Sequence, residues 1–253
     1  MRFKRSFHKL AWLALAWFAV TIASFGIVDL AFTTLGNALY SAATGPPSII
    51  QMPLRLLYMV ISFRVFYIPA LVAVQGSLQG AVLSRWFDRA LIWLPLTALG
   101  MIVGWALAYG LGNGLLVIRA LLGFPIDQPT QYFGVLAWGI ASSVAGVFIG
   151  LAQFLAIRTL SPISVLWIPG TSTLWGLGFA VLRSDTWMRQ FSDWTTQSGV
   201  LAEGGDWYLA VEVLYRLSVA LGEGVIIGAG STLLLVLILM ARKTASNAQS
   251  AAA

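Results

Sequence analysis

The sequence contains no cysteine and a single histidine, His8. Disulfides, thiolate catalysis and cysteine-ligated metals are therefore excluded, and pigment or haem sites built from several histidines are not expected. Charge is also scarce, because Asp, Glu, Lys and Arg together make up 9% of the 253 residues. Soluble domains carry about 25% charged residues, so this is not the composition of a soluble domain. With no constellation of catalytic side chains, we predict a protein that is not an enzyme and has no cofactor and no metal.

Hydrophobic residues, in contrast, make up 59% of the chain, and the mean hydropathy is +0.85. The apolar runs are long and continuous rather than alternating, which favours membrane helices over a β-barrel. The first run, from Leu10 to about Leu30, is too long for the core of a signal peptide, so we interpret it as an uncleaved first helix. These observations predict an all-α integral membrane protein.

Prolines, glycines and short basic turns divide the chain into six predicted transmembrane helices. They cover approximately 10–31 or beyond, 65–83, 90–111, 132–157, 163–182 and 206–241. The Thr44-Gly-Pro-Pro47 stretch should end the first helix, and Gly112-Asn-Gly114 the third. Short interfacial amphipathic helices are expected on the extracytoplasmic side, within 53–66, 115–124 and 187–194. The tail from Lys243 should be disordered.

One stretch of the chain, from Gly76 to Ala106, recurs 74 residues later. The matching positions are Gly76 and Gly150, Gln79 and Gln153, Trp93 and Trp167, Pro95 and Pro169, and Thr97 and Thr171. A fainter third copy places Trp17 and Thr21 in the first helix and Ser231 where the glutamines stand. Such self-similarity predicts a repeated architecture. We expect one membrane domain, 1–253, made of three tandem two-helix repeats (approximately 10–83, 90–157 and 163–241) around a pseudo-threefold axis along the membrane normal.

Glycines spaced four residues apart recur in the second, fourth and sixth helices. They are Gly76 and Gly80, Gly146 and Gly150, and Gly224 and Gly228. Small residues at this spacing let membrane helices approach closely, so we interpret these glycines as helix-packing faces.

The repeated polar residues, together with their counterparts in the third copy, predict a layer in the cytoplasmic half of the bilayer. Its members are Gln79, Gln153, Ser231, Thr21, Thr97 and Thr171. Two interpretations stay open for this layer. The six side chains could line a central path for a polar solute or ion, or they could bond one another and hold the helices together.

Two acidic residues fall within the apolar runs. Asp29 should lie near the outer surface, whereas Glu223, flanked by Gly222 and Gly224, is a candidate for binding or relaying a cation or proton. Three tryptophans that begin helices, Trp17, Trp93 and Trp167, are expected as interfacial anchors or packing residues, with a pigment or hydrophobic ligand as a less favoured alternative.

The distribution of basic residues predicts the orientation. Nine of the lysines and arginines fall on the side of the two termini and six on the other, which places both termini in the cytoplasm. We expect a multi-pass protein of the inner (plasma) membrane or another energy-transducing membrane. Two functions remain: binding or translocation of a small solute or ion along a central polar axis, or a non-catalytic scaffold or accessory subunit of a larger membrane complex. The expected partners are the lipid bilayer and possible other membrane subunits or further copies of this chain, without nucleic acid.

Overall fold

The computed structural model describes residues 7–43, 67–87, 90–122, 131–182 and 207–252. Within these ranges the α-helices are α1 (Phe7–Ala43), α3 (Tyr67–Ser84), α4 (Trp93–Leu121), α5 (Gln131–Ile157), α6 (Trp167–Leu182) and α8 (Trp207–Ala252). Two short 3-10 helices, η1 (Ala90–Ile92) and η2 (Pro162–Leu166), lead into α4 and α6. The predicted all-α fold class is confirmed for the described residues.

Proline sets the boundary of one described helix. Helix α1 is described as far as Ala43, and the Thr44-Gly-Pro-Pro47 stretch that the sequence predicts to end it lies outside the described residues. In the turn between α5 and α6, Ser161 has an extended backbone, with φ −161° and ψ 151°, and Pro162 opens η2. Proline suits this first position, since its missing N–H would have no partner within the helix.

Two predicted helix ends are wrong. Helix α4 continues through Gly112 and Gly114 to Leu121, so residues 115–121 belong to it and not to a separate interfacial segment. Lipid offers the backbone no other hydrogen-bond partner, so glycine is tolerated within membrane helices. Helix α8 also continues to Ala252, and its alanine-rich tail favours the helix over disorder. The interfacial segments expected within 53–66 and 187–194 lie outside the described residues.

Five helices are long and apolar enough to cross a membrane. Their candidate spans are His8–Leu35, Trp93–Arg119, Leu136–Ile157, Pro162–Ala180 and Val213–Arg242. In α3 the apolar part that the structure describes, Ala70–Ser84, is shorter, and a hydrocarbon core of about 30 Å needs about 20 helical residues. The structure fits a multi-pass membrane protein with five candidate spans, one fewer than the sequence predicts.

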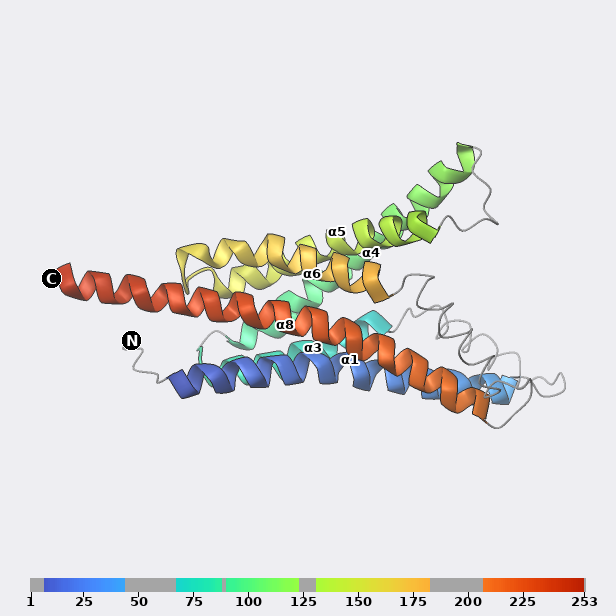
Figure 1. Cartoon of the computed structure of the whole chain (residues 1–253), viewed down its shortest axis with the longest axis horizontal. Helices are drawn as coiled ribbons and strands as arrows, with labels where there is room; N and C mark the ends of the chain where they lie inside the picture. The colour runs from blue at the N-terminus through green and yellow to red at the C-terminus, as the bar shows by residue number, and fades with distance from the viewer. Residues whose placement is uncertain (1–6, 44–66, 88–89, 123–130, 183–206, 253) are drawn as a thin grey trace.

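The helices form a closed bundle (Figure 1). Each of them packs against the next one along the chain, and the last helix, α8, packs back against α1. The beginning of α1 and the end of α8 lie at the same end of the bundle, where the short turns between α3 and α4 and between α5 and α6 also lie. Successive helices therefore run in opposite directions.

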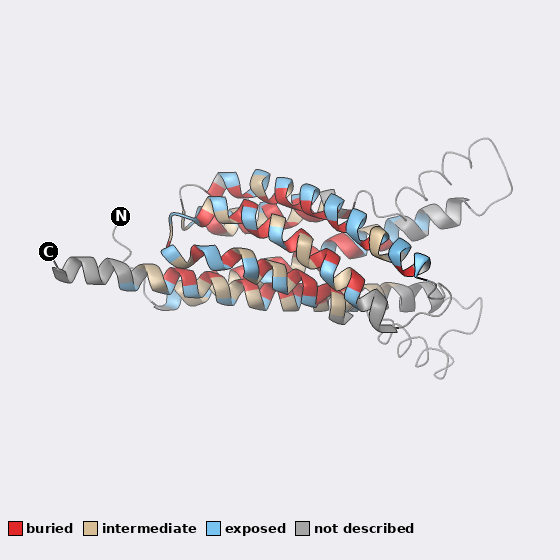
Figure 2. Ribbon diagram, turned by 90° about the horizontal axis from the view of Figure 1, so that it is seen from above, coloured by how far each residue is buried: buried red, intermediate tan, exposed pale blue. Residues whose placement is uncertain are grey.

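Burial divides each helix into an inner and an outer face (Figure 2). The buried side chains form two groups. One group, which includes Leu13 and Leu235, lies in the half of the bundle that holds the two termini, and the other, which includes Phe25 and Met101, lies in the opposite half. The outer faces carry large apolar side chains, such as Leu233, which is 61% exposed. An apolar exterior of this kind suits contact with lipid tails.

Candidate functional site

Three tryptophans meet at the end of the bundle that holds the two termini. Trp17 of α1, Trp93 of α4 and Trp167 of α6 form a triangle with ring centroids 5.4, 6.0 and 6.1 Å apart. Each pair is edge-to-face, which is a preferred arrangement of aromatic rings. All three side chains are at most 2% exposed. This tryptophan triad is therefore a packing element in the interior, and its members do not face lipid as interfacial anchors would.

Each indole of the triad donates its N–H to a buried side chain of a neighbouring helix. The three bonds are Trp93 Nε1 to Gln79 Oε1 (3.2 Å), Trp167 Nε1 to Gln153 Oε1 (2.9 Å) and Trp17 Nε1 to Ser231 Oγ (3.0 Å). The acceptors lie on α3, α5 and α8, and these helices precede α4, α6 and α1 around the closed bundle. The bond between Trp17 and Ser231 joins the first and last helices of the chain.

The two glutamine carboxamides also bond the other helix beside them. Gln79 Nε2 donates to Thr21 Oγ1 at 3.1 Å, and Gln153 Nε2 donates to Thr97 Oγ1 at 3.2 Å. Thr21 Oγ1 in turn donates to the carbonyl oxygen of Trp17 at 2.8 Å. Each glutamine thus links three helices, because it accepts from an indole on one side and donates to a hydroxyl on the other.

Each acceptor of an indole bond, with the threonine of its own hairpin, forms one corner of the polar layer: Gln79 with Thr21, Gln153 with Thr97, and Ser231 with Thr171. The third corner differs from the other two. The Ser231 hydroxyl donates to the Gly228 carbonyl oxygen at 3.3 Å. Thr171, which corresponds to Thr21 and Thr97 in the sequence, has no hydrogen-bond partner for its hydroxyl among the described residues. Its side chain is nevertheless only 5% exposed. Serine is shorter than glutamine and makes no bond to Thr171.

Glycines bring the same pairs of helices into close contact. A Cβ atom placed on Gly76 would lie 3.8 Å from Thr97 Cβ, one on Gly150 3.1 Å from Thr171 Cβ, and one on Gly228 3.4 Å from Thr21 Cβ. Two of the glycines four residues away on the same helix faces also lie close to a neighbouring helix. A Cβ on Gly146 would lie 2.7 Å from Ser172 Cα, and one on Gly224 would lie 2.9 Å from Ile22 Cα. At Gly80 the nearest atom would be 3.8 Å away, an ordinary van der Waals separation.

The six-residue polar layer predicted from the sequence is buried and uncharged. The exposed fractions are 0% for Thr21 and Thr97, 2% for Gln79, 4% for Gln153, 5% for Thr171 and 7% for Ser231. Hydrogen bonds inside an apolar environment hold helices together, at about 0.6–2 kcal/mol each in membranes. The triad donates hydrogen bonds to this layer, and its rings contact one another edge-to-face. This geometry favours the interpretation in which the six side chains bond one another and hold the helices together, over a solvent-filled path.

The two acidic residues singled out in the sequence are both buried, on the adjacent helices α1 and α8. Asp29 is 4% exposed and Glu223 is 0% exposed. Asp29 falls within the candidate span His8–Leu35, and the expectation that it lies near the outer surface of the membrane stays a prediction. Glu223 lies level with Phe25, since a Cβ on the adjacent Gly224 would be 3.4 Å from Phe25 Cβ. Ionisable groups buried in a membrane are candidates for function.

Sequence reasoning did not single out the buried aromatic residues of the other half of the bundle. Trp105 contacts Trp175 and Phe179, with ring centroids 6.0 and 5.0 Å apart, and Phe25 lies 5.9 Å from Trp175. Gln75, at 3% exposure, was also missed. The available signal was the repeat itself, because Phe179 lies 74 residues after Trp105, the same interval that relates the two clear copies.

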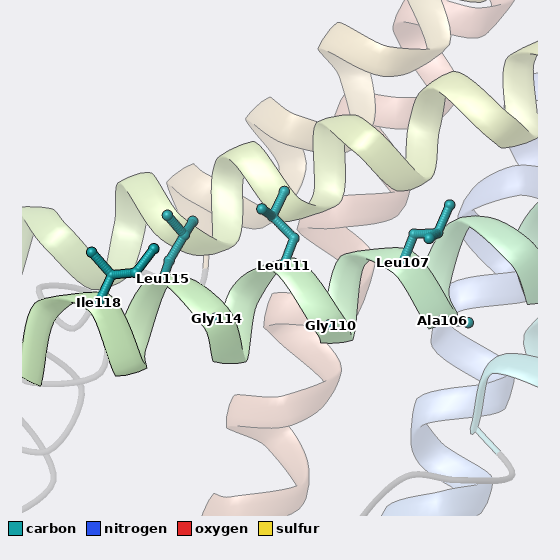
Figure 3. Close-up of a pocket in the computed structure, with 7 residues that line it drawn as sticks. All are labelled: Ala106, Leu107, Gly110, Leu111, Gly114, Leu115 and Ile118. Carbon is teal, nitrogen blue, oxygen red and sulfur yellow. The ribbon is translucent and has the colours of Figure 1, made fainter. Parts of the chain in front are cut away.

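A shallow groove of about 420 Å³ runs along the outside of α4 (Figure 3). All of its lining residues belong to that helix: Ala106, Leu107, Gly110, Leu111, Gly114, Leu115 and Ile118. A Cβ on Gly110 or Gly114 would have no atom within 4 Å. The groove is apolar and open, and it belongs to the exterior of the bundle rather than to the polar layer.

Within the described residues, no group of three or more His, Cys, Asp or Glu side chains is placed to hold a metal ion. No protein-family profile, no curated protein and no solved structure matches the chain. Its function must therefore be argued from the geometry of the buried layer.

Proposed function

We propose that the chain crosses the membrane six times, as three two-helix hairpins related by a threefold axis. Helix α3 would supply the sixth span. Three sets of contacts support this arrangement: the indole bonds, the close approaches of Gly76, Gly150 and Gly228 to threonines, and the three near-equal edge-to-face ring pairs. Each set repeats at the boundary between one hairpin and the next.

We propose that the protein is a non-catalytic scaffold or accessory subunit of a membrane assembly. The observation that carries this proposal is the mutual contact of three buried indoles from α1, α4 and α6, next to a neutral layer whose glutamines bond both neighbouring helices. Such an interior stabilises one arrangement of the helices. The apolar outer faces would then contact lipid, other membrane subunits or further copies of the chain. The membrane would be the inner (plasma) membrane or another energy-transducing membrane, and both termini would lie on its cytoplasmic side.

Binding of a small solute or ion is a second candidate function. It is favoured by the burial of Asp29 and Glu223 on two adjacent helices, in the half of the bundle away from the triad. A solute held there would reach the triad before it reached the opposite end, so translocation along the axis would require the three indoles to separate. Binding without passage is compatible with the closed triad.

Cysteine labelling separates the closed scaffold from a water-filled path. Because the natural chain has no cysteine, single substitutions at Gln79, Gln153 and Ser231 provide the only thiols. We expect all three to resist a membrane-impermeant, water-soluble maleimide in intact membranes and in membranes opened on both sides, since these positions are at most 7% exposed.

The matched control is Ser84→Cys, at the exposed end of α3, which should label once the reagent reaches its side of the membrane. Rapid labelling of all three layer positions would contradict the closed scaffold and favour translocation along the axis. Labelling of the control alone is the outcome that the proposal requires.

A further inference from the structure

The third corner of the polar layer has a serine, Ser231, where the other two have a glutamine. At the first two corners a glutamine accepts from an indole and donates to a threonine hydroxyl, as Gln153 does with Trp167 and Thr97. At the third corner Ser231 accepts from Trp17 but does not reach Thr171. The bond that is missing is the one within the last hairpin, between α8 and α6.

A hydroxyl at 5% exposure with no bond is costly. Leaving a buried polar group unsatisfied costs about 1–3 kcal/mol, so buried polar groups in native proteins are almost always paired with protein or with ordered water. The other two layer threonines each accept a bond from a carboxamide. Thr171 therefore differs from its two counterparts in a way that calls for a partner.

We propose that the third corner binds one water molecule, which bridges Thr171 Oγ1 and Ser231 Oγ. Glutamine extends beyond serine by a CH2 group and a carboxamide, and a single water has a share of liquid volume of about 30 Å³, comparable with a carboxamide. Ser231 Oγ already donates to Gly228 and accepts from Trp17, which leaves one lone pair for a bond from water. Thr171 Oγ1 can both donate and accept. The water would supply the hydrogen bond to the threonine hydroxyl that the carboxamide supplies at the other two corners.

The test uses the full-length protein in lipid nanodiscs with 13C-labelled threonine methyl groups. Cross-relaxation from water to these methyl groups should be seen for Thr171 and not for Thr21 or Thr97, whose hydroxyls bond glutamine. Ser231→Gln should abolish the Thr171 signal, because the carboxamide would take the place of the water. It should also raise Tm by about 2–4 °C, the shift that corresponds to about 1 kcal/mol in a chain of this size.

Gln153→Ser is the matched reciprocal variant, since it gives the second corner the composition of the third. It should create a water signal at Thr97. Absence of a water signal at Thr171 in the natural chain, or its persistence in a folded Ser231→Gln variant, would overturn the proposed water site and leave the closed scaffold intact. Signals at all three threonines would instead show a hydrated layer, which contradicts both the single site and the closed scaffold.

Discussion

Replacing Trp93 with alanine is expected to lower the free energy of unfolding by about 3 kcal/mol, the lower part of the range for buried Trp or Phe to Ala. The side chain is 1% exposed and contacts both other members of the triad. Its removal leaves a cavity at the axis and takes the indole bond from Gln79 Oε1. No lipid or solvent reaches this position to compensate. Reversible unfolding in mixed detergent micelles measures the change.

Trp12→Ala is the control for this prediction. Trp12 lies on α1 five residues before Trp17 but is 71% exposed, so its ring faces outwards. Removing it should change the stability by less than about 0.5 kcal/mol, as for other surface substitutions. Equal losses for the two variants would show that the triad does not carry the interior packing described here.

A leucine at Gly104 is expected to force helices α4 and α5 apart and to destabilise the protein strongly. Even a Cβ at this position would lie 2.7 Å from the Ala145 carbonyl oxygen and 3.0 Å from Ala145 Cα, and both are backbone atoms of α5 that cannot rotate away. Helices α4 and α5 must separate to accommodate it. Overpacking costs about 1–3 kcal/mol and occasionally more, so we expect a loss of about 3 kcal/mol in the same unfolding assay.

Gly110→Leu, on the same helix, controls for the intrinsic effect of the substitution. A Cβ there meets no atom within 4 Å, and the position lines the open groove of Figure 3. Leucine has a higher helix propensity than glycine by about 1 kcal/mol, so this variant should be as stable as the natural protein or slightly more so. A fall in stability comparable to that of Gly104→Leu would contradict the assigned α4–α5 contact.

The members of the polar layer could be picked out from the sequence because they stand at repeated intervals. The register of Gln79 and Gln153 relative to the threonines suggested that these polar side chains bond one another, but the bonds from the indoles to the glutamines were not predicted. It could not say whether these side chains face the axis or the lipid, because a helix that is apolar all round has no marked polar face. The direct contact between the three indoles was therefore not predictable.

Other differences follow from local rules that the membrane environment overrides. Gly112 and Gly114 would end a helix in water but lie inside α4, where the backbone has no other way to satisfy its hydrogen bonds. The burial of Asp29 was not predicted, because distance along α1 indicates a depth in the membrane and not which neighbours cover the side chain. The unusual third corner was visible as Ser231 in place of glutamine, but its consequence for Thr171 required the packed structure.

The most direct test of the threefold arrangement is disulfide formation at three matched pairs of cysteines. The pairs are Gly76 with Thr97, Gly150 with Thr171, and Gly228 with Thr21, whose Cβ positions are 3.8, 3.1 and 3.4 Å apart. Disulfides join Cβ atoms about 3.5–4.5 Å apart. The first pair lies within this range and the other two lie slightly below it, so after a small outward shift of the helices all three double variants should form an intrachain disulfide with a membrane-permeant oxidant, as measured by the loss of free thiols.

The mismatched pair of Gly76 and Thr171, on α3 and α6, should stay reduced. The pair of Gly228 and Thr21 matters most, because it joins the last helix to the first. Oxidation of all three matched pairs, without the mismatched one, is the result that we expect from hairpins closed around a common axis. If the first two pairs oxidise while Gly228 and Thr21 keep their thiols, α8 does not close the bundle against α1 and the account is wrong.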